Sequence, residues 1–130
     1  MTISMTTLVN LGHDDAIEAV TAALQAEQFG VLTTIDVSAT LKMKLDVDFR
    51  PYSILGACNP PLAFRALSAD DEAGMLLPCN VTVQEVENGR SRITIVDPES
   101  LFTLIDSEEG TAVAVLAKEW LQRVVDQLEA

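Results

Sequence analysis

The sequence is poor in positive charge, in cysteine and in histidine. It has 130 residues, with 8 Lys plus Arg against 20 Asp plus Glu, and its net charge is −12. An acidic surface repels phosphate backbones and anionic lipid headgroups. The few cations are scattered along the chain without forming a stripe. We therefore expect neither nucleic acid nor a membrane surface among the partners.

Few side chains are available for disulfides or for metal binding. Two cysteines, Cys58 and Cys79, are too few for a disulfide scaffold and fit a reducing compartment, so we expect a cytoplasmic protein. A structural zinc site needs four ligands, and the two cysteines together with the single histidine, His13, supply only three. We expect no metal and no cofactor. His13 is expected to be an exposed residue at a helix start.

Several patterns that specify a location or a reaction are also missing. The first ten residues contain no basic region followed by an apolar core, and nowhere do eighteen apolar residues run together. We therefore expect neither an export signal nor a membrane span. The chain has no Gly-x-Ser-x-Gly, phosphate-binding loop, dinucleotide fingerprint or His-Glu-x-x-His. No motif specifies a reaction.

The sequence does contain enough apolar material for one folded domain. Hydrophobic residues make up 48% of the chain, and its length lies near the usual domain size. A chain of this size buries roughly two-thirds of its unfolded surface. We expect a single domain over residues 1–130 that needs no disulfide or metal to fold.

Hydrophobic periodicity predicts strands and helices that follow one another along the chain. Strands are expected at residues 3–9, 29–37, 52–58 and 77–85, and in a hairpin partner after residue 89. Helices are expected at residues 14–28 and 38–45, after Asn59, after Asp97, and from Asp106 to the C-terminus. This order predicts an α+β fold with a largely antiparallel sheet and helices gathered on one face.

The ends of two of these helices carry terminal signals. Gly30 follows the last turn of the first long helix and is predicted to terminate it. Asp106 and Glu109 are spaced as a capping box for the final helix. The final helix has the broadest apolar stripe in the chain.

The predicted hairpin admits two registers. A two-residue loop at Asn88 and Gly89 would pair Val83 with Thr94 and would mix the two faces of the hairpin. A three-residue loop with a left-handed Gly89 pairs Val83 with Ile93 instead, and places the apolar side chains of both strands on one side. We favour the second register.

The segment 55–61 is the most informative for function. Asn59 followed by two prolines is typical of a helix start, and Cys58 lies one residue ahead of it. The free N–H groups and the positive dipole end of such a helix can stabilise a thiolate. A cysteine that closes an apolar strand is, however, more often a small buried side chain with its thiol intact.

Cys79 stands in a similar context, because it too is followed by an asparagine, Asn80. Alternation along the strand points Cys79 inward, where it can face the other cysteine, although the spacing resembles no Cys-x-x-Cys redox motif. Pro78 predicts an edge position or a bulge for this strand.

No catalytic residue is assigned. The candidate ligand-binding or reactive residues are Cys58, Asn59, Cys79 and Asn80.

Phrases in the middle of the chain resemble a widespread prokaryotic family, domain of unknown function 302 (DUF302). They are FGVLT, IDV, FRPY, ILGACNP and LLPCNV, and the resemblance spans about residues 29–98. It implies a β-α-β-β-β-β-α layout like that of TATA-binding-protein halves, with a curved antiparallel sheet under helices, often as a homodimer. The family carries no established reaction, so the resemblance implies a fold without a mechanism.

Three hypotheses of function follow. The leading one is a small soluble binding module, homodimeric, with a small-ligand site near Cys58, Asn59 and Cys79. The first alternative is a thiol-dependent enzyme or redox protein that uses Cys58. The second is a structural or interaction protein without a pocket, recognised through an exposed apolar patch.

Overall fold

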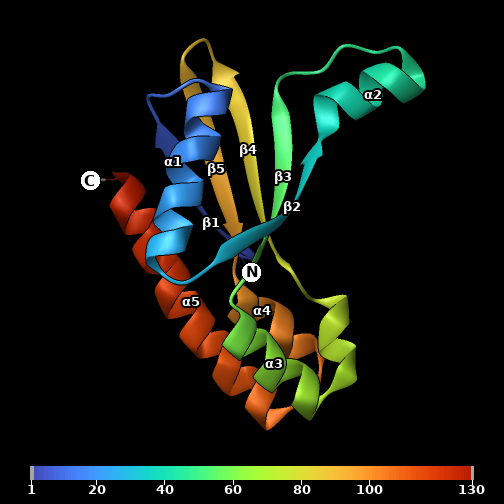
Figure 1. Cartoon of the computed structure of the whole chain (residues 1–130), viewed down its shortest axis with the longest axis vertical. Coiled ribbons are helices and arrows are strands. Elements are labelled where there is room, and N and C mark those ends of the chain that lie inside the picture. Colours follow the sequence, from blue (N-terminus) through green and yellow to red (C-terminus); the bar gives the residue numbers. More distant parts are fainter. Residues whose placement is uncertain (1, 130) are drawn as a thin grey trace.

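The computed structural model describes residues 2–129. Within them, five strands form one antiparallel sheet with the order β1-β5-β4-β3-β2 (Figure 1). The strands are β1 Ser4–Val9, β2 Gly30–Asp36, β3 Tyr52–Cys58, β4 Cys79–Glu87 and β5 Arg90–Val96. The predicted α+β fold with an antiparallel sheet is confirmed, and β1 and β2 lie at its two edges.

Helices cover the sheet unevenly. They are α1 His13–Ala26, α2 Val37–Leu45, α3 Pro60–Ala69, α4 Pro98–Leu101 and α5 Glu108–Glu129, with short 3-10 turns η1 Asp71–Met75 and η2 Phe102–Leu104. Helices α1 and α5 contact each other and pack on the sheet, while α3 and α4 pack against α5 (Figure 1). Helix α2 extends away from this body at the end of β2.

The core lies between the sheet and the helix pair α1 and α5. Strands β3, β4 and β5 turn alternate side chains toward these helices, and these are fully buried: Leu55, Ala57, Val81, Val83, Ile93 and Ile95. The two helices supply the opposing side chains Val20, Leu24, Leu121 and Val124. Full burial of a Val, Leu or Ile side chain contributes roughly 1.5–3 kcal/mol, so this layer is the main source of stability.

The hairpin has the predicted register but not the predicted loop. Val83 pairs with Ile93, as expected, and Gly89 has a left-handed φ of 79°. The loop itself has two residues, because the ladder resumes with Glu87 opposite Arg90. A bulge between residues 85 and 87 adds one residue to β4 and thereby restores the register that keeps the apolar side chains together.

Two predicted helix ends are wrong. Helix α1 ends at Ala26, Gln28 takes the left-handed conformation with a φ of 67°, and Gly30 already belongs to β2. At the start of α5, Ser107 rather than Asp106 acts as the cap, since its Oγ accepts a hydrogen bond from the backbone N–H of Gly110 at 2.9 Å. Adjacent residues can each end a helix or cap its start, and spacing in the sequence does not tell which of them does so.

Pro78 marks neither an edge strand nor a bulge, contrary to the prediction: the ladder between β3 and β4 is regular from Cys79 onward. Pro78 lies immediately before β4, which is the central strand of the sheet, and the Leu77–Pro78 peptide bond is cis. Because the strand begins at Cys79, the missing N–H of proline removes no hydrogen bond from the ladder. Pro78 packs on Gly56 of β3, where an added Cβ would stand 2.8 Å from Pro78 Cγ.

Candidate functional site

A small apolar cavity lies where the sheet ends against α3 and α5. We name it the cysteine cavity, because both cysteines line it together with Asn59. Its volume is about 30 Å³. The other walls are apolar and include Phe29, Leu62, Ala63, Leu77, Phe102 and Ala114.

The pairing of β3 with β4 brings the two cysteines to this cavity. Ala57 is the register partner of Cys79, so Cys58 is the next residue along the neighbouring strand. Cys79 is buried, as predicted, whereas Cys58 at the end of β3 is half-buried, and both are free thiols. The cavity therefore has sulfur atoms from two strands in its wall.

Asn59 acts as the predicted cap of α3. Its Oδ1 accepts a hydrogen bond from the backbone N–H of Leu62 at 3.1 Å, and its Nδ2 donates to the carbonyl of Gln28 at 3.3 Å. The amide oxygen and the amide nitrogen of this buried side chain therefore both have hydrogen-bond partners within the protein. Asn59 holds α3 against the segment that leads into β2, and its main contribution to the cavity is to position the neighbouring residues.

Asn80, the fourth candidate, lies apart from the other three. Side chains alternate along β4, so Asn80 is exposed where Cys79 is buried, and it is absent from the cavity wall. Its register partner is Gly56. The structure thus brings Cys58, Asn59 and Cys79 together and leaves Asn80 outside.

Burial governs the chemistry of the two thiols. Desolvation raises the pKa of Cys58 above its usual 9.0. It also raises the pKa of Cys79 to about 11, with Cys58 nearby as a second cause. An activated cysteine needs a lowered pKa, and burial shifts the pKa of both thiols in the opposite direction. Both cysteines are neutral thiols near pH 7.

The size and polarity of the cavity limit what it can accept. A volume of about 30 Å³ holds one or two water-sized groups, whereas pockets for larger ligands commonly measure 300–1,000 Å³. The wall offers neutral sulfur and hydrocarbon, with the one polar side chain, Asn59, already bonded. The cavity thus fits a small apolar group better than an ion.

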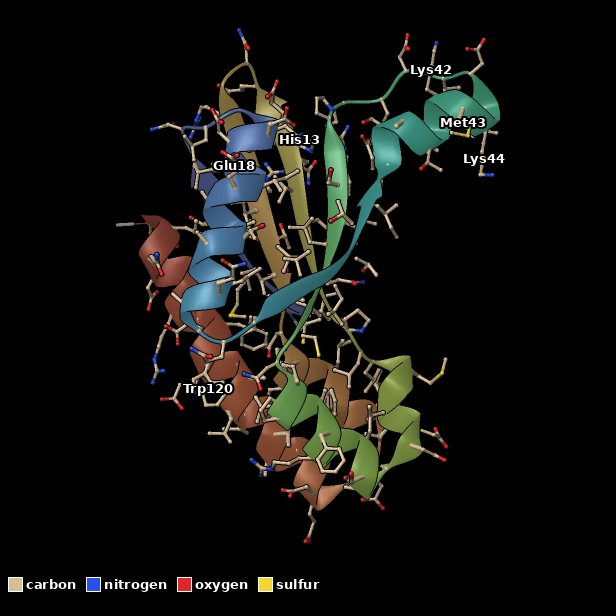
Figure 2. The ribbon with its side chains drawn as sticks, viewed as in Figure 1. His13, Glu18, Lys42, Met43, Lys44 and Trp120 are labelled. Atoms are coloured by element: carbon tan, nitrogen blue, oxygen red, sulfur yellow. The ribbon has the colours of Figure 1, made fainter. Side chains whose placement is uncertain are left out.

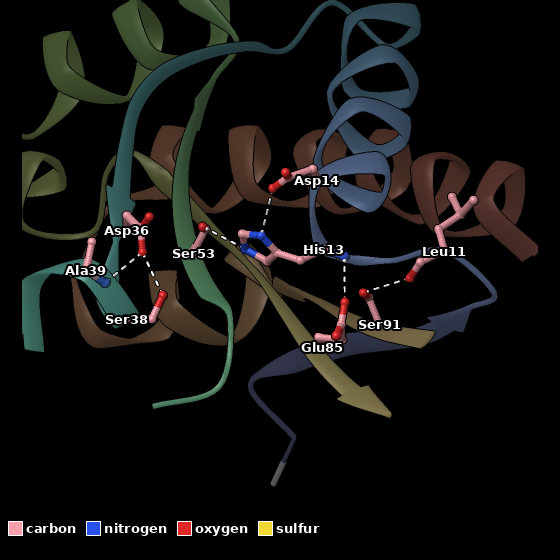
Figure 3. Close-up of polar contacts among 9 residues, drawn as sticks. All are labelled: Leu11, His13, Asp14, Asp36, Ser38, Ala39, Ser53, Glu85 and Ser91. Carbon is pink, nitrogen blue, oxygen red and sulfur yellow. Dashed lines mark hydrogen bonds and ion pairs between the residues drawn. The ribbon is translucent and has the colours of Figure 1, made fainter. Parts of the chain in front are cut away.

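A second cluster, which the sequence reasoning missed, centres on His13 (Figure 3). Its Nε2 lies 2.9 Å from Ser53 Oγ and its Nδ1 lies 3.2 Å from Asp14 Oδ1. The backbone N–H of His13 donates to Glu85 Oε1 at 3.1 Å. The side chain of His13 is only 13% exposed, so the expectation of an exposed histidine is wrong. The partners come from α1, β3 and β4, and only the tertiary fold brings them together.

This cluster has the residue types of a Ser-His-Asp hydrolase but not its accessibility. In such enzymes the serine meets the substrate and the aspartate is buried behind the histidine. Here Ser53 is 2% exposed, while the Asp14 side chain is 98% exposed. The cluster therefore links the start of α1 to β3 and gives no support to a nucleophilic role.

Metal-binding and membrane-spanning features are absent from the part of the chain that the structure describes. Between residues 2 and 129, no three His, Cys, Asp or Glu side chains gather closely enough to hold a metal ion. In the same range, no helix combines the length and apolarity needed to cross a membrane.

These features define a class of protein: an α+β domain in which a five-stranded antiparallel sheet meets a helical layer over a small cysteine-lined cavity. The model of the family described as "Domain of unknown function DUF302" matches residues 5–128. The chain belongs to the DUF302 family, as the resemblance indicated. The match extends the similarity from the middle of the chain to β1, α1 and α5.

A solved structure agrees with this assignment. The chain is similar to an uncharacterized conserved DUF302 protein from Bacillus stearothermophilus, with 30% sequence identity and a TM-score of 0.88. The similarity covers 98% of this chain and 99% of that one. No curated protein matches the chain. The family and the fold are thus established, and neither assigns a reaction.

Proposed function

We propose that the protein is a small-molecule-binding module whose ligand inserts an apolar group into the cysteine cavity. The observation that carries the proposal is the meeting of Cys58, Cys79 and Asn59 around one apolar void at the start of α3. Voids larger than a water molecule are few in a packed protein interior. Support for binding rather than catalysis comes from the raised pKa of both thiols.

The dimensions of the void define the kind of ligand. About 30 Å³ admits only a methyl-sized group or two, so the rest of the ligand lies outside the void. Three residues of the wall are half-buried and in contact with solvent: Cys58, Ala63 and Leu77. We take these to form the mouth, where a neutral, largely apolar molecule has one end inserted.

We also propose that the module acts as a homodimer in the cytoplasm. Free thiols at Cys58 and Cys79 are compatible with a reducing compartment. Large apolar side chains on α2 are exposed in the single chain, which favours a partner. The order of strands and main helices also suits the β-α-β-β-β-β-α layout of TATA-binding-protein halves, with α2 and α3 as additions.

A matched pair of substitutions on α3 tests the binding site. Ala63→Phe places a ring at the half-buried mouth of the cavity, and Ala69→Phe places the same ring at an exposed position of the same helix. We expect native mass spectrometry of the purified protein to detect a bound small molecule in the wild type and in Ala69→Phe, and to detect none in Ala63→Phe.

A defined set of probes provides a second readout. Short alkanols are added, and the Tm is followed for the same three proteins. A ligand at 100 times its Kd stabilises the folded state by about 2.7 kcal/mol, so a probe that fits raises the Tm of the wild type and of Ala69→Phe only. No bound mass and no change in Tm with any probe would overturn the proposal.

A further inference from the structure

An arm projects from the body of the molecule. We define the arm as residues 30–50, which comprise β2, α2 and the loop that follows α2 (Figure 1). Helix α2 contains no buried residue. Met43 is 82% exposed, Leu45 66% and Leu32 of β2 65%. In Figure 2 the side chains of Lys42, Met43 and Lys44 point away from the rest of the protein.

The arm is nevertheless well ordered by local contacts. Asp36 caps α2 by accepting the backbone N–H of Ala39 at 3.0 Å. At the other end of α2, Lys42 Nζ lies 3.1 Å from Asp46 Oδ1 and 3.3 Å from Asp48 Oδ1. A nine-residue helix with no fully buried residue is marginal in water, so these contacts define its shape, while packing on the rest of the chain adds little stability.

The returning loop fixes the direction of the arm. Arg50 donates from Nε to Gln84 Oε1 on β4 at 2.9 Å, and its guanidinium lies 4.4 Å from the ring centroid of Phe49. Phe49 in turn lies 6.1 Å, between ring centroids, from Tyr52 of β3. The arm is thus anchored at its base, with its apolar side chains presented outward.

Strand β2 adds an open edge to the arm. In the described chain it pairs with β3 alone, and its other edge has no strand partner. Monomeric proteins commonly protect such an edge with lysine, proline or a β-bulge. The strand reads GVLTTID and contains no lysine or proline, and a bulge between Val31 and Thr33 is its one irregularity. Leu32 and Ile35, both more than half exposed, stand on this edge strand. The edge has the character of an interface.

Charge indicates which partner the arm accepts. Residues 30–50 contain three cations and three acids, so the whole net charge of −12 lies on the rest of the chain. Two copies of such a molecule repel each other wherever their acidic bodies meet. At the arm this repulsion is absent. Lys42 already pairs with Asp46 and Asp48 of its own chain, whereas Lys44 can face an acid of another copy.

We infer that the arm is the surface through which two copies of this chain associate, arm against arm about a twofold axis. A twofold interface uses the same patch on both copies, and an arm that is apolar, neutral and open at a strand edge is complementary to itself. A stable interface buries about 800 Å² on each partner, which an edge strand and a helix together can supply. This inference rests on the homodimer in the proposed function and identifies its interface.

Two exposed methionines provide a matched test. Met43 of the arm is 82% exposed, and Met75 of η1 is 83% exposed. The turn η1 lies at the end of the molecule opposite to α2 (Figure 1). Met43→Glu and Met75→Glu should therefore change the stability of the single chain little. Each places a negative charge on a different surface of the molecule. Sedimentation equilibrium over a range of concentrations measures the mass of each, and far-UV circular dichroism checks the fold.

We expect the wild type and Met75→Glu to sediment at twice the chain mass of 14.0 kDa, and Met43→Glu to weaken the dimer at least tenfold in Kd. A dimer that survives Met43→Glu and dissociates with Met75→Glu would overturn the arm as the interface while leaving the homodimer in place. A monomeric wild type would overturn both. Ligand binding at the cysteine cavity is measured separately and does not depend on either result.

Discussion

The Nε2 atom of His13 lies 2.9 Å from the Oγ of Ser53, and this contact joins the first turn of α1 to the start of β3 across 40 residues of sequence. A further tie holds the same turn to β4, since the backbone N–H of His13 donates to Glu85. Helix α1 is thereby fixed across the sheet at its N-terminus, and its apolar face is directed into the core.

Ser53→Ala removes the buried partner of His13. We expect a loss of about 1–2 kcal/mol in the free energy of unfolding, because a half-buried imidazole nitrogen is left without its hydrogen bond. Urea denaturation measures this loss. Ser68→Ala, at an exposed position of α3, is the control and should change stability by less than about 0.5 kcal/mol. Equal stability of the two variants would contradict a role for the contact.

Alkylation of the cysteines should depend strongly on pH. Burial raises the pKa of Cys58 above 9.0 and that of Cys79 to about 11. The thiolate fraction of Cys79 near pH 7 is then about 100-fold below that of an ordinary thiol. We expect slow labelling of Cys58 near pH 7, with a rate that rises with pH and is still rising at pH 9, and no labelling of Cys79 without unfolding.

Mass spectrometry after iodoacetamide treatment, with Cys79→Ala to isolate Cys58, measures the labelling rates. Fast labelling of Cys58 below pH 7 would revive the thiol-dependent enzyme, since it requires a lowered pKa.

Gly56→Ala tests the close packing that places Cys79 at the cavity. An added Cβ would collide with Thr33 Oγ1 and stand 2.8 Å from Pro78 Cγ. Overpacking of this kind costs about 1–3 kcal/mol, measured as a lower urea midpoint. Gly30→Ala is the matched control, because an added Cβ there meets nothing within 4 Å. A similar midpoint for both variants would show that β3 can shift without cost.

The ion pair between Asp97 and Lys118 predicts a dependence of stability on pH. Burial alone would raise the pKa of Asp97. The hydrogen bond and charge of Lys118, whose Nζ lies 3.0 Å from Oδ2, act together with the backbone N–H groups of Glu99 and Ser100; jointly they outweigh burial and lower this pKa below 3.8. A carboxyl group with a lowered pKa in the folded state contributes stability above its unfolded pKa, and loses it as the pH falls through the folded pKa.

Asp97→Asn removes the charge but keeps a side chain that can cap α4. We expect the free energy of unfolding of the wild type to exceed that of this variant by up to about 1 kcal/mol at pH 7, and the difference to shrink as the pH falls toward 2. Urea denaturation at the two pH values measures it. A difference of the same size at pH 2 would mean that the charge is not its source.

Local patterns predicted much of the fold. Alternation along β4 identified Cys79 as buried, and the requirement for one apolar face selected the pairing of Val83 with Ile93. The cap at Asn59 was also predictable, because its partner Leu62 is only three residues away. Such features depend on neighbours in the sequence, which composition and spacing record directly.

Features that depend on distant residues were missed or wrong. The burial of His13 involves a contact with Ser53, which lies 40 residues away in the sequence. The position of Pro78 before a central strand depends on the order of all five strands in the described sheet. The register between β3 and β4, and the packing of α3 and α5 against them, decide which candidate residues line the same cavity. That register also separates Asn80 from the other three.

The sequence by itself determined the class of fold, the apolar faces of the main elements and the acidic surface, since these follow from periodicity and composition. Only the tertiary structure decided that two neutral thiols meet at an apolar void and that α2 extends from the body without burial. The reason is that desolvation, which sets the pKa of Cys58, and exposure, which marks the arm, depend on how distant segments pack together.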